Sequence, residues 1–295
     1  MRSSAMTMPK ISVVLTVFPL VFLSCAGWRP PGQSVVDPDG QPANQMIYKQ
    51  IDTVALALRL YYPSDMASEE ARAAIVFFFG GGWRGGTMEQ FAPHARHYAE
   101  RGMVGVLADY RVESRHGTTP FEAVRDAKSA IRYLRAHADS LGIDPQRIVA
   151  AGGSAGGHLA AAAGTLDGLE EPGEDLSVSS RPDALVLFNP VFDNGPQGYG
   201  FERVGGMASY RQISPLHNID DTAPPTVVFL GTRDHLVPVA TAVDYCRRMT
   251  EAGVYCELHL YGGQEHGFFN ARSPEYYRKT VAAADPFLEA LGFFD

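Results

Sequence analysis

Three short motifs carry side chains that can cooperate in nucleophilic catalysis. Gly152-Gly153-Ser154-Ala155-Gly156 places a serine between small residues, and Asp234 and His266 follow it along the chain. A serine hydroxyl is a poor nucleophile, so it needs a base to accept its proton and an acid to orient that base. The order serine, acid, histidine is one of the known chain orders of such a triad. We therefore predict Ser154 as nucleophile, His266 as base and Asp234 as acid.

A glycine run upstream of the serine can supply hydrogen-bond donors for the negative charge that develops on an attacked carbonyl oxygen. Gly80-Gly81-Gly82-Trp83 follows Ala73–Phe79, a continuous apolar run typical of a strand buried on both faces. Glycine lets consecutive backbone amides turn toward one ligand. We predict that the amides of Gly81, Gly82 and Ala155 form an oxyanion hole.

The substrate pocket is predicted from position in the chain. Trp83 follows the glycine run, and Phe268 lies two residues after His266. Asn194–Ala223 is the longest stretch without a clear hydrophobic period, and it lies between two predicted core strands. In open α/β sheets, ligands bind at the carboxyl ends of the strands. We expect Trp83 and Phe268 to line the pocket and this stretch to form a small lid or pocket-forming insertion.

Other polar residues have structural interpretations. His94 and His97 are three residues apart on a predicted helix without a third ligand, which favours surface residues over a metal pair. His158 is expected to pack on the helix that follows the serine, and Arg111 to pair with Asp126. The sequence shows no metal-ligand cluster, no phosphate loop followed by lysine and no dinucleotide fingerprint, so it predicts no metal and no cofactor.

The elements that must position these residues alternate between strands and helices. The chain has 295 residues, of which 45% are hydrophobic and 20% charged, as in an ordinary globular protein. Alternation of apolar strands with helical segments predicts a mostly parallel, doubly wound α/β sheet with helices on both faces. The net charge of −8 argues against nucleic acid, whose phosphates attract a basic surface.

The N-terminal residues have the pattern of an export signal. A basic start precedes an apolar run, Ile11–Leu23, which is too short to span a membrane as a helix. Phe22-Leu23-Ser24-Cys25 resembles a bacterial lipobox, with Cys25 as the lipidated residue, and ordinary cleavage after Ala26 is the alternative. Either route predicts an exported protein that is a periplasmic or outer-membrane lipoprotein, tethered through Cys25, or is secreted.

Three regions of the chain follow from this pattern. We predict a signal peptide of lipoprotein type at 1–24, a flexible tether rich in proline and glycine at 25–45, and a single domain at 46–295. Within the domain, Cys246 lies on a predicted helix and Cys256 on the following strand. In an oxidising compartment the two form either a disulfide or a pair of buried thiols, and the sequence does not choose between them.

Together the motifs resemble those of the α/β-hydrolase superfamily, in the branch of hormone-sensitive-lipase-like and acetyl-xylan- or feruloyl-esterase-like serine esterases. The resemblance rests on Gly80–Trp83, Asp109–Arg111, Gly152–Gly156, Leu230–Asp234 and His266–Phe268, and it covers about Met46 to Phe294. It implies the α/β-hydrolase fold with a small cap insertion. It also implies hydrolysis of short-chain carboxylic esters through an acyl-enzyme, with the roles given above and without a cofactor.

Two departures from the family pattern bear on the site. Phe79 stands where the family usually has a histidine that orients the glycine loop. The long helical cap that precedes the first strands in hormone-sensitive-lipase-like enzymes is missing from this sequence. A smaller cap would leave a more open site, which suits a bulky, polar substrate. Because Phe79 replaces the orienting histidine, the geometry of the glycine loop is the feature that departs most from the family pattern.

These observations predict an exported serine esterase for small-molecule or oligosaccharide esters, such as acetyl or feruloyl groups on carbohydrates. The alternatives on the same scaffold are a general carboxylesterase or lipase, a formamidase and a peptidase. A more distant alternative is a catalytically silent binding protein that kept the fold. The sequence is silent on the oligomeric state.

Overall fold

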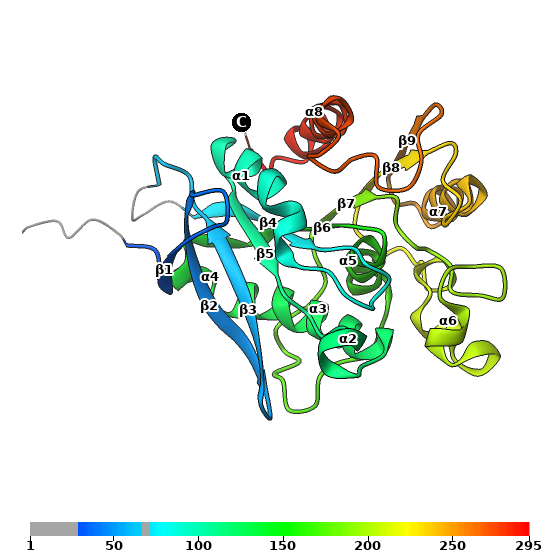
Figure 1. The fold of residues 1–295 in the computed structure, drawn as a ribbon, viewed down its shortest axis with the longest axis horizontal. Helices are drawn as coiled ribbons and strands as arrows, with labels where there is room; N and C mark the ends of the chain where they lie inside the picture. Colours follow the sequence, from blue (N-terminus) through cyan, green and yellow to red (C-terminus); the bar gives the residue numbers. More distant parts are fainter. Residues whose placement is uncertain (1–28, 67–70, 295) are drawn as a thin grey trace, which may run out of the picture.

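A nine-stranded sheet forms the centre of the part of the chain that the computed structural model describes, residues 29–66 and 71–294 (Figure 1). The strand order is β1-β2-β3-β5-β4-β6-β7-β8-β9. All pairings from β5 to β9 in this order are parallel, and the three pairings that join β1, β2, β3 and β5 are antiparallel. The predicted signal peptide and Cys25 lie outside the described residues.

The strands alternate with helices over most of the chain. The strands are β1 (Gln33–Val36), β2 (Pro42–Ile51), β3 (Val54–Tyr61), β4 (Arg72–Phe78), β5 (Val104–Ala108), β6 (Ile143–Gly153), β7 (Ala184–Phe188), β8 (Thr226–Gly231) and β9 (Cys256–Tyr261). The α-helices are α1 (Ala92–Glu100), α2 (Glu113–His116), α3 (Pro120–Ala136), α4 (Ala138–Leu141), α5 (Ala155–Thr165), α6 (Tyr210–Ile213), α7 (Val239–Glu251) and α8 (Pro274–Ala290). Short 3₁₀ helices are η1 (Met88–Phe91), η2 (Phe201–Val204), η3 (Gly206–Ala208) and η4 (Pro215–His217).

The predicted fold class is confirmed. The central strands β5, β7 and β8 are buried along their whole length, as the continuous apolar runs indicated. Helices α1 and α8 lie on one side of the sheet, and α3 and α5 lie on the other (Figure 1). Within the described residues, no helix combines the length and apolar character needed to cross a membrane. The described chain is therefore one doubly wound sheet with helices on both faces.

The predicted tether at 25–45 is wrong for its second half. β1 pairs with the start of β2, so the sheet begins at Gln33 and not near Met46. The turn between these strands is fixed by Asp37, whose carboxylate accepts hydrogen bonds from Tyr61 at 2.9 Å and from Arg96. An edge strand with one exposed face lacks the continuous apolar run that reveals a central strand, so its polar sequence resembled a linker. β2 and β3 form an antiparallel hairpin, and β3 lies inside the sheet beside β5.

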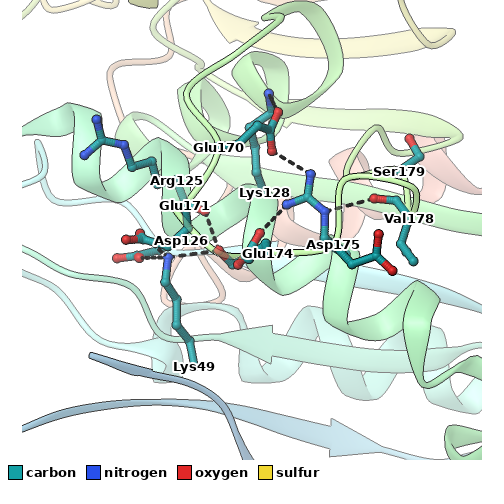
Figure 2. A network of polar contacts seen from close by, with 12 residues as sticks. Lys49, Arg125, Asp126, Lys128, Glu170, Glu171, Glu174, Asp175, Val178 and Ser179 are labelled. Atoms are coloured by element: carbon teal, nitrogen blue, oxygen red, sulfur yellow. Dashed lines mark hydrogen bonds and ion pairs between the residues drawn. The ribbon is translucent and has the colours of Figure 1, made fainter. Parts of the chain in front are cut away.

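A cluster of buried and partly buried charges fixes the long loop between α5 and β7 against α3 and β2 (Figure 2). Lys49 binds Asp126 at 2.7 Å and Glu171 at 2.6 Å, and Lys128 binds Glu170 at 2.6 Å. The predicted partner of Asp126, Arg111, contacts it at 2.7 Å. We call this group the ionic network, and its members are Lys49, Arg111, Asp126, Lys128, Arg132, Glu170, Glu171 and Glu174.

A disulfide joins two elements that flank the last parallel strands. Cys246 in α7 and Cys256 at the start of β9 are bonded, with 5.2 Å between their α-carbons. Of the two states that the sequence left open, the structure therefore shows the disulfide. The bond fastens α7 to β9, and these elements border the loops that carry Asp234 and His266.

Candidate active site

Ser154 occupies a strained turn between β6 and α5. Its backbone has φ 55° and ψ −118°, a conformation that a residue with a side chain rarely adopts. The turn is tight because β4 passes close to the start of α5. A β-carbon on Gly156 would lie 1.9 Å from the carbonyl oxygen of Phe78, so only glycine fits there. The small residues around the serine thus let the chain reverse and present the hydroxyl at the carboxyl edge of the sheet.

The three predicted triad residues come together. His266 Nε2 lies 2.9 Å from Ser154 Oγ, and His266 Nδ1 lies 2.7 Å from Asp234 Oδ2. Asp234 follows β8 and His266 follows β9, so neighbouring parallel strands deliver both loops to the same edge. With its Nδ1 proton donated to Asp234, His266 keeps the Nε2 lone pair for the serine proton.

The carboxylate of Asp234 is stabilised in its charged form. Burial acts to raise its pKa, but the hydrogen bond with His266 and those from the backbone amides of Val237 and Leu236 lower it, and the net pKa lies below the ordinary value. The two amides donate to Oδ1 at 2.9 Å each, which leaves Oδ2 for the imidazole. Asp234 is therefore a fixed anion beside His266, suited to stabilise an imidazolium.

The glycine loop lies beside the serine. A β-carbon on Gly80 would lie 3.4 Å from the β-carbon of Ser154. Gly81 and Gly82 have φ values of 131° and 60°, which glycine adopts without strain. Within the described part of the chain, the amides of Gly81, Gly82 and Ala155 have no protein acceptor, and Ala155 opens helix α5. Free amides at a helix N-terminus and in a glycine loop are suited to bind an anionic oxygen.

Asn189 is a site residue that the sequence reasoning missed. It follows β7, is fully buried and has a φ of 36°. Its Oδ1 accepts the amide of Gly267 at 2.9 Å, and its Nδ2 lies 3.5 Å from His266 Nε2. The available signal was its position, a polar side chain directly after a buried strand at the carboxyl edge.

The prediction that Trp83 and Phe268 line the substrate pocket is wrong. Trp83 is only 1% exposed, and its ring packs against His158 and Tyr199. Phe268 is 6% exposed and packs against the rings of Tyr261, Phe269 and Tyr276. Both aromatic rings are core residues under the loops, because a position next to a motif does not fix the direction of a side chain.

The insertion between β7 and β8 borders the glycine loop on one side. It consists of short helices, η2, η3, α6 and η4, which agrees with its lack of a hydrophobic period. Asn194 donates to the carbonyl of Tyr199 at 3.0 Å, and the Tyr199 hydroxyl would lie 2.6 Å from a β-carbon on Gly82. Tyr199 therefore forms a wall beside the predicted oxyanion donors.

Two histidines outside the triad are buried. The prediction of a surface position is wrong for His94, which is enclosed by aromatic rings, and burial, with the charge of His97, lowers its pKa to about 3. His158 does pack on the helix after the serine, as predicted. Its Nε2 lies 2.9 Å from the carbonyl oxygen of Ile213, and burial lowers its pKa to about 4. No group of three metal-binding side chains occurs within residues 29–66 and 71–294.

Comparisons with known proteins agree with this geometry. Residues 58–193 match the BD-FAE family, and residues 194–295 match the dienelactone hydrolase family. Esterase 2 of Thermogutta terrifontis, in its apo form, superposes with a TM-score of 0.82 at 46% sequence identity, over 86% of this chain and 96% of that one.

The curated relatives of this chain include esterases. Esterase LipC of Mycobacterium tuberculosis is 32% identical over 245 residues, which are 74% of this chain and 58% of LipC. An acetylxylan esterase of Xylanibacter ruminicola is 28% identical over 57% of this chain and 35% of its own length. The chain spans about half the length of several of its curated relatives. Its fold and its likeness to the esterase from Thermogutta over nearly that whole chain establish that it belongs to the α/β-hydrolase superfamily, among the serine esterases.

Proposed function

We propose that this protein hydrolyses short-chain carboxylic esters through an acyl-enzyme on Ser154. The observation that carries the proposal is the continuous contact from Asp234 through His266 to the serine hydroxyl, at 2.7 and 2.9 Å. A base within hydrogen-bond reach of a nucleophile, itself oriented by a third group, is the arrangement that acyl transfer requires.

The reaction follows from the positions of these groups. Ser154 Oγ attacks the ester carbonyl while His266 Nε2 accepts its proton, and Asp234 stabilises the resulting imidazolium. The amides of Gly81, Gly82 and Ala155 hold the oxyanion of the tetrahedral intermediate. His266 then protonates the leaving alcohol, and in the second half-reaction it activates the water that releases the acid.

The substrate is proposed to carry a small acyl group. The Tyr199 wall occupies the space beside Gly82, next to the predicted oxyanion donors. Structures of the Thermogutta esterase have been described with propionate and with butyrate bound. Of the acetyl and feruloyl groups that the sequence suggested, the small acetyl group on carbohydrates is therefore the proposed natural substrate. The likeness to an acetylxylan esterase supports this choice.

Acyl-length profiling tests this function. The mature protein and Ser154→Ala would be assayed with p-nitrophenyl acetate, butyrate and octanoate, and then with acetylated xylan oligosaccharides. The proposal expects turnover that falls with acyl length, that extends to the oligosaccharides and that Ser154→Ala abolishes. Preference for octanoate would favour a lipase, and turnover of anilides alone would favour an amide hydrolase. Absence of turnover by folded wild-type protein would favour a silent binding protein.

We also propose export, with a lipid tether at Cys25. The disulfide supports an oxidising compartment, because such bonds persist mainly outside the cytosol. Expression in a bacterial host with labelled fatty acid tests the tether. The label should appear on the wild-type protein and be lost in Cys25→Ser. A wild-type protein that is recovered unlabelled from the soluble periplasm would contradict it.

A further inference from the structure

Two loops of the site must keep a fixed distance, although their strands are far apart in the sheet. The glycine loop follows β4, and the His266 loop follows β9, with β6, β7 and β8 between them. Oxyanion donors and a general base act on the same carbonyl group, so a shift of either loop misplaces one of them. A direct connection between the loops would fix their separation independently of the strands that carry them.

The side chains of Gln90 and Asn270 make such a connection. Gly80 donates its amide to Gln90 Oε1 at 2.6 Å, and Gln90 Nε2 donates to Asn270 Oδ1 at 2.9 Å. Asn270 Nδ2 then donates to the carbonyl oxygen of Gly267, next to His266, at 2.7 Å. We call this chain of three hydrogen bonds the Gln90–Asn270 bridge. Its middle bond joins two residues that are 180 positions apart in the sequence.

The bridge completes the fixation of the peptide that leads into the glycine loop. The carbonyl oxygen of Phe79 accepts the Tyr110 hydroxyl at 2.7 Å, and the amide of Gly80, in the same peptide unit, is held by Gln90. Because a peptide unit is planar, these two bonds fix its orientation just before Gly81. The ring of Phe79 stacks on Tyr110 with centroids 4.1 Å apart, so the residue at the position of the usual histidine does not hold the loop through a polar side chain.

The other end of the bridge is held in the same way. The carbonyl oxygen of Gly267 accepts from Asn270, and its amide donates to Asn189 Oδ1 at 2.9 Å. The residue next to His266 is thus held on both sides. The bridge therefore joins two backbone positions that each have a second anchor, Tyr110 at the glycine loop and Asn189 at the His266 loop.

We propose that Gln90 and Asn270 are positioning residues that hold the oxyanion donors and His266 in one geometry, with Gln90 in place of the usual loop histidine. The inference rests on the proposed function. It assigns no chemical step to either residue. Both side chains also line a cavity of about 430 Å³ whose lining includes none of the triad residues or oxyanion donors. Contact with a part of the substrate that extends into this cavity is the competing interpretation.

Kinetics of isosteric variants separate these interpretations. Gln90→Met and Asn270→Leu remove the hydrogen bonds at similar volume. Tyr277→Phe is the matched control, because its hydroxyl donates to the carbonyl of Pro93 at 3.0 Å, joining α8 to α1 without contact to either catalytic loop. Because misplacement of reacting groups by about 1 Å costs about 10²-fold, we expect each bridge variant to lose roughly 10- to 100-fold in kcat on p-nitrophenyl acetate.

Several results would follow from a positioning role. KM should change less than about threefold, since only transition-state interactions are lost. The double variant should be little worse than either single variant, because one broken bond already uncouples the loops. Tyr277→Phe should stay within about twofold of the wild type. Gln90→Glu, which keeps an acceptor for the Gly80 amide, should recover part of the lost kcat.

Other results would overturn the proposal. A rise in KM at unchanged kcat would assign the two residues to substrate binding, and additive losses would show that they act separately. Equal losses in Tyr277→Phe would reduce the bridge to general stability. If Gln90→Met does not fold, Asn270→Asp gives the same test, because it keeps the acceptor for Gln90 but loses the donor to Gly267. An inactive wild type would contradict the proposed function, whereas an active wild type with fully active variants would contradict the bridge alone.

Discussion

Two clusters of buried charge in this molecule differ in what they leave free. In the ionic network, four cationic and four anionic side chains pair with one another around α3, and carbonyl oxygens accept further hydrogen bonds from Lys128 and Arg132 (Figure 2). In the triad, the anion of Asp234 has its oxygens satisfied, but the cluster ends at His266 Nε2 and the serine hydroxyl. Every charge in the network has an ionic partner. The triad instead keeps the lone pair of His266 Nε2 and the proton of Ser154 Oγ for the reaction.

The physical cause of the charged state is similar in both clusters. Burial acts to raise the pKa of Glu171, but Lys49 and Arg111 lower it, and the net pKa is below the ordinary value, as for Asp234. A lowered carboxylate pKa therefore does not distinguish catalysis from structure in this protein. The position of the group does, because the triad lies at the carboxyl edge of the sheet beside free amides.

Removal of the base has the largest expected effect on activity. His266→Ala should lower kcat on p-nitrophenyl acetate by roughly 10⁴- to 10⁶-fold, as loss of a triad member does elsewhere. The free energy of unfolding should change by less than about 2 kcal/mol, because the residue is partly exposed and outside the network. Stopped-flow or steady-state kinetics and thermal unfolding measure the two effects. A variant that retained a tenth of wild-type turnover would remove His266 from the mechanism.

Disruption of the network should show the reverse pattern. Asp126→Ala leaves Lys49 and Arg111 without their shared fully buried partner and should cost about 3–5 kcal/mol of stability. At roughly 2–4 °C per kcal/mol, thermal unfolding should occur about 6–20 °C lower. The kcat of the folded protein should stay within about threefold of wild type.

An exposed ion pair is the control for this stability effect. Glu275→Ala removes the exposed pair with Lys279 and should leave the temperature of thermal unfolding nearly unchanged, because solvent screens exposed ion pairs. Equal stability losses in Asp126→Ala and Glu275→Ala would contradict a structural role of the network.

Loss of the disulfide should have a smaller effect, located in the half of the sheet that carries the triad. Cys246→Ser with Cys256→Ser opens a link over a sequence separation of 10 residues, which the chain-entropy account values at roughly 2–3 kcal/mol. We expect lower thermal stability and unchanged kcat at 25 °C. Unchanged thermal unfolding after complete reduction of the wild type would show that the bond does not constrain the unfolded chain.

The acid dependence of stability should give the smallest effect. The pKa of Glu171 is below its ordinary value of 4.5 when folded, so its contribution is fully present above pH 4.5 and is lost as the pH falls through the folded pKa. Between pH 7 and 3, the temperature of thermal unfolding should therefore fall more steeply for the wild type than for Glu171→Gln. Identical slopes would exclude Glu171 from the acid transition.

The comparison of the two clusters also explains what the sequence revealed. The triad was predictable because each member closely follows a strand, and parallel strands bring such residues to one edge. The strands before Ser154 and Asp234 end in buried residues, whereas His266 follows the partly exposed edge strand β9. Of the network, only the pair of Arg111 with Asp126 was predicted. Glu170 and Glu171 lie in an aperiodic polar loop, and nothing in the sequence indicates that the loop folds back onto Lys49 and α3.

Other features depend on side-chain direction and on distant contacts. The rings of Trp83 and Phe268 pack inward, although both lie beside motifs. Gln90 and Asn270 are 180 residues apart, and no motif connects them. The first strand of the sheet lies within the segment predicted as a tether, because a short edge strand carries little hydrophobic signal.

Covalent labelling tests the central claim most directly, namely that Ser154 is a nucleophile activated by this triad. Wild type and Ser154→Ala would each be treated with paraoxon, and intact-protein and peptide mass spectrometry would locate the adduct. The account predicts one diethylphosphoryl group per wild-type molecule, on Ser154, and none on folded Ser154→Ala. Folded wild-type protein that stays unlabelled, or equal labelling of both proteins, would contradict it.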